Sequence, residues 1–220
     1  MIAAASCVAV LLAIISLLIR KRGNQNNGSD TAHKEASTLK AIRSREKSLQ
    51  DLANIDPSKP QIRILYGTQT GTAERFAKQL GKEISKKYPA EGTHVEIIDV
   101  ENYSGPDRLP TEKGRLVVLC MATYGDGEPT DSANEFYSWL CKEAEAVEEG
   151  SKEPSLKGVT YAVFGLGNQQ YEHFNAVGRR VFKCLGALGA SPITPRGDGD
   201  DDGLIDEEFD AVRLHYYYLS

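Results

Sequence analysis

From residue 62 onward, short apolar runs alternate with longer stretches in which apolar residues recur every three or four positions. We expect strands at residues 62–66, 94–100, 115–122, 159–164 and 192–194, and helices at 71–88, 131–147 and 175–188. Strands that are apolar nearly throughout are typical of a parallel sheet whose two faces are covered by helices. The sequence therefore predicts an α/β domain with a doubly wound, five-stranded parallel sheet of order 2-1-3-4-5.

An uncharged apolar run precedes this domain at residues 2–19, and Arg20, Lys21 and Arg22 follow it. As a helix that rises about 1.5 Å per residue, the run spans roughly 27 Å, close to the thickness of an endoplasmic-reticulum bilayer. No basic residue precedes the run and no small-residue cleavage site follows it, which favours a membrane anchor over a cleaved signal peptide. Because basic flanks stay in the cytosol, the rest of the chain is expected to face the cytosol.

The chain is therefore expected to have four parts. They are an anchor with its basic stop at residues 1–22, a polar tether at 23–60, the folded domain at 61–213 and a tail at 214–220. The tether opens on an Asn-, Gly- and Ser-rich segment. Pro57 and Pro60 mark its end because proline cannot continue a helix.

Charge and composition exclude several functions. The formal net charge of −5 argues against nucleic-acid binding, which needs clustered basic residues, and suits a basic partner instead. The cysteines show no CxxC spacing and the histidines are scattered, so we expect no metal site. We interpret Cys7, Cys120, Cys141 and Cys184 as structural thiols in a reducing compartment.

Three loops rich in glycine and polar residues follow the first, third and fourth predicted strands, at residues 67–72, 123–128 and 165–171. In the predicted sheet these strands are neighbours, and their carboxyl ends meet where the strand order reverses. Ligands bind at that point in such sheets. We therefore expect all three loops to build one pocket.

The first loop has the composition of a phosphate-binding turn. It opens a helix, whose unpaired N–H groups favour an anion, while Thr68, Thr70 and Thr72 add hydroxyl donors and Gly71 permits close approach. The loop lacks the lysine of GxxxxGK[ST], which disfavours a nucleoside triphosphatase. A neutral loop of this kind suits one terminal phosphate; a capped turn without a ligand is the alternative.

The other two loops carry Tyr124 and Tyr171, which are expected to sandwich a flat ring such as an isoalloxazine. Each stacked aromatic pair contributes about 0.5–1.5 kcal/mol beyond burial. Gly165 and Gly167 do not complete a dinucleotide fingerprint, because Gln170 stands where GxGxxG requires glycine. We interpret these glycines as letting the loop backbone run along a flavin edge.

Four motifs together resemble the FMN domain of the diflavin reductase family. They are YGTQTGTAE at 66–74, ATYGDGEPTD at 122–131, FGLGN at 164–168 with YEHFN at 171–175, and GDDD at 199–202. The resemblance covers about residues 60–213 and implies a flavodoxin-like fold with bound FMN. The apolar run at 2–19 makes the resemblance more specific: within that family, the NADPH–cytochrome P450 reductases are the members with a membrane anchor.

By that resemblance, the three loops and one acidic residue hold the phosphate, ribityl chain and ring of FMN, with Gly125 near flavin N5. The implied FMN-binding residues are Thr68, Gln69, Thr70, Gly71, Thr72, Ala73, Ala122, Thr123, Tyr124, Gly125, Leu166, Gly167, Asn168, Gln169, Gln170, Tyr171, Glu172, His173, Phe174, Asn175 and Asp201. No side chain is expected to be catalytic, because the flavin supplies the redox chemistry.

An acidic rim is expected to dock a basic haem protein, the alternative being a solvated, charged helix start. Its members are Asp126, Glu128, Asp198, Asp200, Asp201, Asp202, Asp206, Glu207, Glu208 and Asp210.

The resemblance implies one-electron transfer from a reduced flavin donor to cytochromes P450 and other haem proteins at the endoplasmic reticulum. Family members continue into FAD- and NADPH-binding domains, whereas residues 214–220 diverge from the family. We therefore expect a shortened member that lacks the FAD and NADPH sites and does not oxidise NADPH unassisted. Two alternatives stay open: a non-catalytic docking module, and a free-standing FMN quinone reductase.

Overall fold

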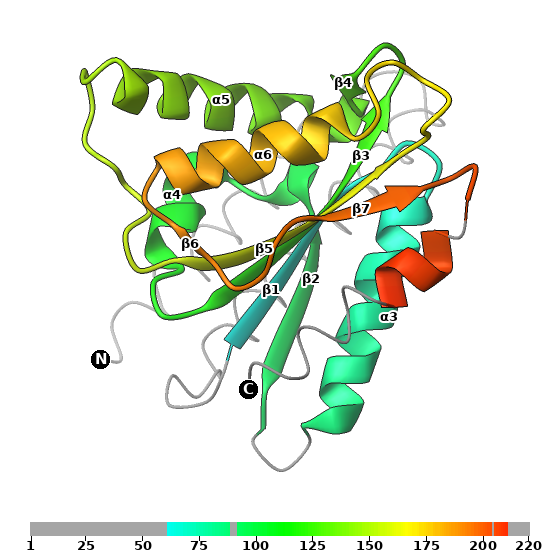
Figure 1. The fold of residues 1–220 in the computed structure, drawn as a ribbon. Helices are drawn as coiled ribbons and strands as arrows, with labels where there is room; N and C mark the ends of the chain where they lie inside the picture. Colours follow the sequence, from blue (N-terminus) through cyan, green and yellow to red (C-terminus); the bar gives the residue numbers. More distant parts are fainter. Residues whose placement is uncertain (1–60, 89–91, 204, 211–220) are drawn as a thin grey trace, which may run out of the picture. The chain divides into compact units, whose positions relative to one another are not determined.

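The computed structural model describes residues 61–88, 92–203 and 205–210, which form a twisted, mainly parallel sheet flanked by helices (Figure 1). Its main strands are β1 (Gln61–Gly67), β2 (His94–Asp99), β3 (Leu116–Tyr124) and β5 (Thr160–Gly167). The strand order is β2-β1-β3-β5-β6, and at the centre Leu65 lies between Ile98 of β2 and Leu119 of β3. The α/β fold with a parallel sheet is therefore confirmed.

Helices cover both faces of the sheet. The long ones are α3 (Thr72–Lys87), α5 (Asn134–Glu148) and α6 (Ala176–Ala187). Because successive side chains of a strand point to opposite faces, β3 contributes to two cores. Val118 and Cys120 are buried with α3, whereas Val117, Leu119 and Met121 are buried with α5 and α6. This two-sided burial explains why β3 is apolar along most of its length.

Helix α3 shows how the apolar period fixes the packing. Phe76, Leu80 and Ile84 recur at four-residue spacing and are all buried. The Phe76 ring lies 5.6 Å from that of Phe164 on β5 and 4.4 Å from that of Phe209, between centroids. The helix thereby joins the sheet to the helical residues 205–210 at the C-terminal end of the described chain.

The predicted fifth strand is wrong in its boundaries. Instead of one strand at 192–194, two short strands pair with β5: β6 (Ser191–Pro192) and β7 (Gly197–Asp200). Pro192 and Pro195 lack the N–H group that a continuous strand would donate. The chain therefore pairs, leaves the ladder and pairs again.

Several short elements also escaped prediction. They are η1 (Val100–Asn102), α4 (Gly105–Arg108), η2 (Leu109–Thr111), β4 (Glu128–Pro129) and η3 (Asp131–Ala133). β4 is antiparallel to β3 and folds the second glycine-rich loop back on its own strand. η3 occupies the predicted first turn of α5, which begins three residues later.

The predicted anchor at 2–19, tether at 23–60 and tail at 214–220 lie outside the described residues, so they stay predictions. Within the described ranges, no helix combines the length and the apolar character that crossing a bilayer requires.

Candidate functional site

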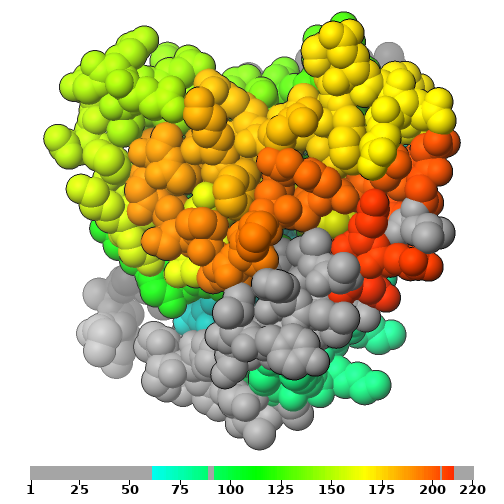
Figure 2. All heavy atoms as spheres, viewed as in Figure 1, coloured from blue at the N-terminus to red at the C-terminus, as the bar shows by residue number. Residues whose placement is uncertain are grey.

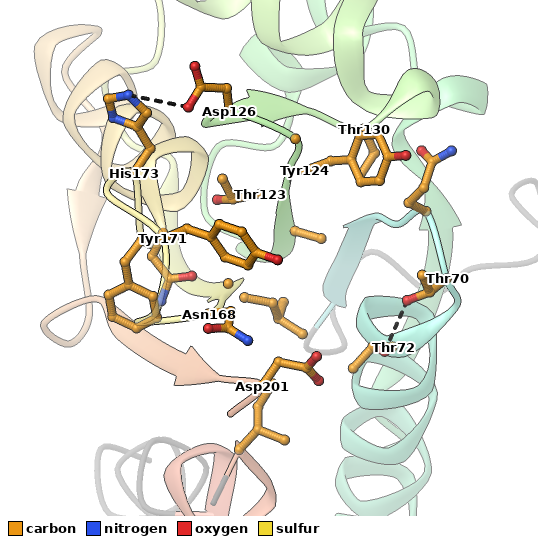
Figure 3. A pocket seen from close by; sticks show the side chains of 18 of the residues that line it. Thr70, Thr72, Thr123, Tyr124, Asp126, Thr130, Asn168, Tyr171, His173 and Asp201 are labelled. Atoms are coloured by element: carbon orange, nitrogen blue, oxygen red, sulfur yellow. Dashed lines mark hydrogen bonds and ion pairs between the residues drawn. The ribbon is translucent and has the colours of Figure 1, made fainter. Parts of the chain in front are cut away.

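A cavity of about 580 Å³ opens at the carboxyl ends of β1, β3 and β5, where the three glycine-rich loops converge (Figure 3). Its volume falls in the range of small-molecule pockets, which is about 300–1,000 Å³. Most of the predicted cofactor-binding residues line it: Gln69, Thr70, Thr72, Ala122, Thr123, Tyr124, Gly125, Leu166, Gly167, Asn168, Tyr171, Glu172, His173, Phe174, Asn175 and Asp201. The structure thus brings the three loops together, as the strand order predicts.

Five predicted residues do not line the cavity: Thr68, Gly71, Ala73, Gln169 and Gln170. Thr68 Oγ1 accepts a hydrogen bond of 3.0 Å from the Gly71 N–H, and Ala73 is fully buried under the loop. Gln169 N–H donates to Asp200 Oδ1 at 3.0 Å, and Gln170 Nε2 donates to Asp202 Oδ2 at 2.5 Å. These residues thus make contacts within and beneath the loops and do not face the cavity.

The first loop ends at the start of α3. Gly71 precedes the helix with a φ of 91°, a left-handed conformation that favours glycine. The first N–H groups of a helix have no intrahelical acceptor and attract anions. The hydroxyls of Thr70 and Thr72 lie 3.3 Å apart beside this helix start (Figure 3). Of the described residues that line the cavity, none is lysine or arginine, so the donors here are neutral.

Two tyrosine rings project toward the cavity from different loops (Figure 3). Tyr124, at the end of β3, is 52% exposed, and Tyr171, in the loop after β5, is 66% exposed. Large aromatic rings usually bury most of their area, so two exposed rings at one cavity offer faces on which a flat ligand could stack.

The third loop is held by a buried asparagine at its end. Asn175 is fully buried with a φ of 51°, and its Nδ2 donates to Asp198 Oδ1 at 3.2 Å and to the Gly199 carbonyl at 3.3 Å. Its Oδ1 has no hydrogen-bond partner among the described residues. A Cβ on Gly167 would lie 2.6 Å from that oxygen, so only glycine fits there. The cavity wall therefore holds a buried acceptor without a donor.

The third loop also packs against the C-terminal part of the described chain, as the space-filling view shows in yellow and orange-red (Figure 2). The Asp201 N–H donates to the Gly167 carbonyl at 2.8 Å. Asp200 is buried, and its Oδ1 accepts from the N–H groups of Gln169 and Asp202. This bonding fixes Asp201 at the cavity.

The acidic rim is smaller than the sequence suggests. Asp198 binds Arg196 through Nε at 2.8 Å, Asp200 is buried, and Asp206 forms an ion pair of 2.7 Å with Arg75. Including Asp200 in an exposed rim was wrong, because it is buried and serves internal hydrogen bonds, whereas Asp198 is partly exposed. The members exposed to solvent are Asp126, Glu128, Asp201, Asp202, Asp206 and Glu207.

Three lining residues were not among the predicted cofactor-binding set: Asp126, Thr130 and Ile205. Asp126 lies 3.8 Å from His173 Nε2 at the cavity, across two loops. Thr130 is fully buried and belongs to the motif at 122–131, which was a usable cue. For Ile205 the sequence holds no such cue, because it reaches the cavity only through the turn at 201–203.

The flavodoxin family matches residues 64–213. The chain is 42% identical over 188 residues to the NADPH–cytochrome P450 reductase of Sus scrofa, covering 83% of this chain and 26% of that protein. It is 46% identical over 158 residues to the human protein of that name, covering 71% and 21%. The chain thus spans about a quarter of the length of these curated relatives.

Solved structures show the same fold. A flavodoxin of Streptococcus pneumoniae TIGR4 superposes with a TM-score of 0.56 at 20% identity, covering 72% of this chain and 97% of that one. A cysteine variant of a Pseudomonas aeruginosa flavodoxin gives 0.55 at 23% identity, covering 72% and 96%. At these identities the likeness concerns the fold alone.

Proposed function

Because the chain belongs to the flavodoxin family, we propose that its cavity binds FMN and that the protein passes electrons from this cofactor to haem proteins such as cytochromes P450. One observation carries the proposal. A hydroxyl-rich helix start and two exposed tyrosine rings, on three separate loops, line a single cavity at the carboxyl ends of neighbouring parallel strands. The similarity to NADPH–cytochrome P450 reductases supports the choice of acceptor.

The donors and acceptors of the cavity fit FMN. The start of α3 with Thr70 and Thr72 would hold the phosphate by neutral donors. Tyr124 and Tyr171 would cover the ring. The free Oδ1 of Asn175 is a buried acceptor that suits a hydroxyl donor, as on a ribityl chain. Bound FMN would supply the one- and two-electron chemistry, while these side chains bind it, orient it and exclude water.

The surroundings of the cavity suit a basic partner. Glu128 and Glu207 are exposed, and Glu207 belongs to the same helical segment as the cavity-lining Ile205. Carboxylates near an electron-transfer site attract a basic haem protein and speed encounter.

We further propose that residues 2–19 anchor the protein in the endoplasmic reticulum with this domain in the cytosol. Deleting them should release the protein from microsomes, and retention of the deleted form would contradict the anchor.

Titration of the full chain with FMN and with FAD tests the proposed cofactor. FMN should bind about equimolarly with quenched flavin fluorescence, because its single terminal phosphate matches the helix start. FAD should not compete, since its phosphates are internal and carry a bulky nucleoside. Absence of quenching by FMN, or equal binding of both flavins, would contradict the proposal.

A further inference from the structure

Two cysteines that are far apart in the sequence meet between α5 and α6. Cys141 Sγ and Cys184 Sγ lie 3.8 Å apart, with Cys184 as hydrogen-bond donor. The two helices pack beside each other on the same face of the sheet (Figure 1). Cys184 is buried, whereas Cys141 is partly exposed to solvent. The interpretation of these residues as separate structural thiols missed this contact.

The groups around the two sulfurs shift their pKa values in opposite directions. The Cys184 thiol donates a hydrogen bond to Cys141 Sγ, and the Arg180 guanidinium and the Tyr137 hydroxyl also lie beside Cys141. Together these three groups lower the pKa of Cys141 to about 6. The pKa of Cys184 is raised by the same hydrogen bond and by burial. At neutral pH, Cys141 is therefore the thiolate and Cys184 the protonated partner, the arrangement of a nucleophile beside a resolving thiol.

A third thiol provides the contrast. Cys120 is fully buried in β3, and desolvation raises its pKa to about 12. A protonated, inaccessible sulfur neither reaches nor attacks an oxidant. Reactivity is thus confined to one of the three cysteines within the described residues.

We propose that Cys141 and Cys184 form an oxidation site for hydroperoxides, in which a reversible disulfide joins α5 to α6. The Cys141 thiolate attacks one peroxide oxygen, the O–O bond breaks, and Cys141 becomes a sulfenic acid while hydroxide (or alkoxide) leaves. The Cys184 sulfur then attacks the Cys141 sulfur, and the S–O bond breaks to release water. With hydrogen peroxide, two thiols lose two electrons and two protons, and the peroxide becomes two waters.

Closing the bond requires the two sulfurs, now 3.8 Å apart, to approach to about 2.05 Å. The disulfide would tie together the helices that follow two of the cavity loops: α5 follows β4 and η3, and α6 directly follows Asn175. It would close a loop across a sequence separation of 43 residues. A cross-link of this span restricts the conformations that the unfolded chain can adopt. Oxidation should therefore raise the midpoint temperature of thermal unfolding by about 5–10 °C. The inference does not depend on the proposed cofactor.

Peptide mapping of the full chain tests the site. The reduced, desalted protein is exposed to equimolar hydrogen peroxide, alkylated and digested, with the Cys7 peptide read separately. A Cys141–Cys184 linked peptide, lighter by two hydrogen atoms, should appear and disappear again with dithiothreitol. The Cys120 thiol should take at least tenfold longer than the Cys141 thiol to be lost to oxidation, as measured by the fraction that can still be alkylated. Sulfinic acid on Cys141 without a linked peptide, or oxidation of Cys141 no faster than that of Cys120, would overturn the proposal.

Variants then assign the two roles. Cys184→Ala should stop the reaction at a sulfenic acid that dimedone traps on Cys141, formed more slowly than in the unchanged protein because the thiol that lowers the pKa of Cys141 is gone. Cys141→Ala should leave Cys184 unoxidised. Arg180→Gln should slow oxidation several-fold, and Arg179→Gln, which removes the same charge from a side chain bonded to the Phe174 carbonyl, should not. Dimedone capture on Cys184 in place of Cys141 would overturn the assignment.

Discussion

Tyr171 is 66% exposed where it lines the cavity, so most of its surface is available to a bound ligand. Replacing Tyr171 with alanine should weaken FMN binding by about 1–3 kcal/mol, or roughly 5- to 150-fold, because stacking and burial are both lost. Tyr171→Phe keeps the ring and is the matched control, with a dissociation constant close to that of the unchanged protein. Fluorescence titration measures both. An unchanged constant in the alanine variant would remove Tyr171 from the site.

The lowered pKa of Cys141 leads to a second prediction at the scale of single residues. The titratable and charged groups around the thiol pair are Tyr137, Glu145 and Glu148 on α5, and Arg180 and Lys183 on α6. Because the pKa of Cys141 is lowered from 9.0 to about 6, its thiolate persists as the pH falls from 9 toward 6. Its alkylation by iodoacetamide should therefore be nearly constant between pH 7 and 9 and fall below pH 6.

The same shift has a consequence for stability. A cysteine with a lowered pKa stabilises the fold fully above its unfolded pKa, and this contribution disappears as the pH falls through about 6. Cys184→Ala removes the largest cause of the shift, so alkylation of Cys141 in this variant should rise steeply between pH 7 and 9. A flat profile in the variant would show that the neighbouring thiol does not set the charge.

At the scale of single elements, β1 carries a buried arginine whose partners come from other elements. Arg63 Nε lies 3.0 Å from Glu112 Oε1 and 3.1 Å from Glu96 Oε2, and both Arg63 and Glu112 are about 1% exposed. Arg63→Leu would remove one of the two arginines that pair with the buried Glu112 carboxylate, while Arg115 Nη1, 2.8 Å from Glu112 Oε2, would remain. The free energy of unfolding should fall by about 1.5–3 kcal/mol, measured by urea denaturation, because the charge of Glu112 stays partly compensated.

An exposed arginine provides the control for this loss. Arg75 also forms an ion pair with a carboxylate, that of Asp206, but both side chains are largely in solvent. Arg75→Leu should cost about 1 kcal/mol or less, because exposed pairs are screened and its contact with the Phe76 ring adds little. Equal losses in the two variants would mean that burial does not govern the Arg63 cluster.

The elements also show what a sequence can predict. The period of apolar residues located the four main strands and three long helices, because that period reflects which faces are buried. It failed at β7, whose sequence Gly-Asp-Gly-Asp has little strand preference and pairs only because β5 offers an edge. The converging loops followed from strand order, whereas Asp200 looked like surface charge and proved to be an internal acceptor. Contacts between distant segments, such as Cys141 with Cys184, leave no pattern in the chain.

At the scale of the whole molecule, exposed carboxylates near the cavity should steer a basic partner. The chemically reduced, FMN-loaded protein should reduce cytochrome c more slowly as ionic strength rises from about 0.05 to 0.5 M, because the Debye length shortens. The double variant Glu128→Gln and Glu207→Gln should flatten this salt dependence in stopped-flow measurements. FMN affinity should change little.

The matched control carries the same loss of charge at the other end of the domain. Glu149 and Glu153 are exposed and follow the C-terminal end of α5, away from the carboxyl ends of the strands. The variant Glu149→Gln with Glu153→Gln should keep the original salt dependence. If both double variants respond alike, net charge rather than the position of the carboxylates governs encounter.

The broken pairing along β5 bears on how this protein behaves at high concentration. A long, flat outer strand offers a row of free N–H and C=O groups to another molecule, which is a common route to aggregation. Here that border consists of two short pieces, with Pro192 and Pro195 interrupting it. At this border a second molecule would find no continuous ladder to extend. The irregular segment from Ser191 to Asp200 thus helps to keep copies of the protein from joining sheet to sheet.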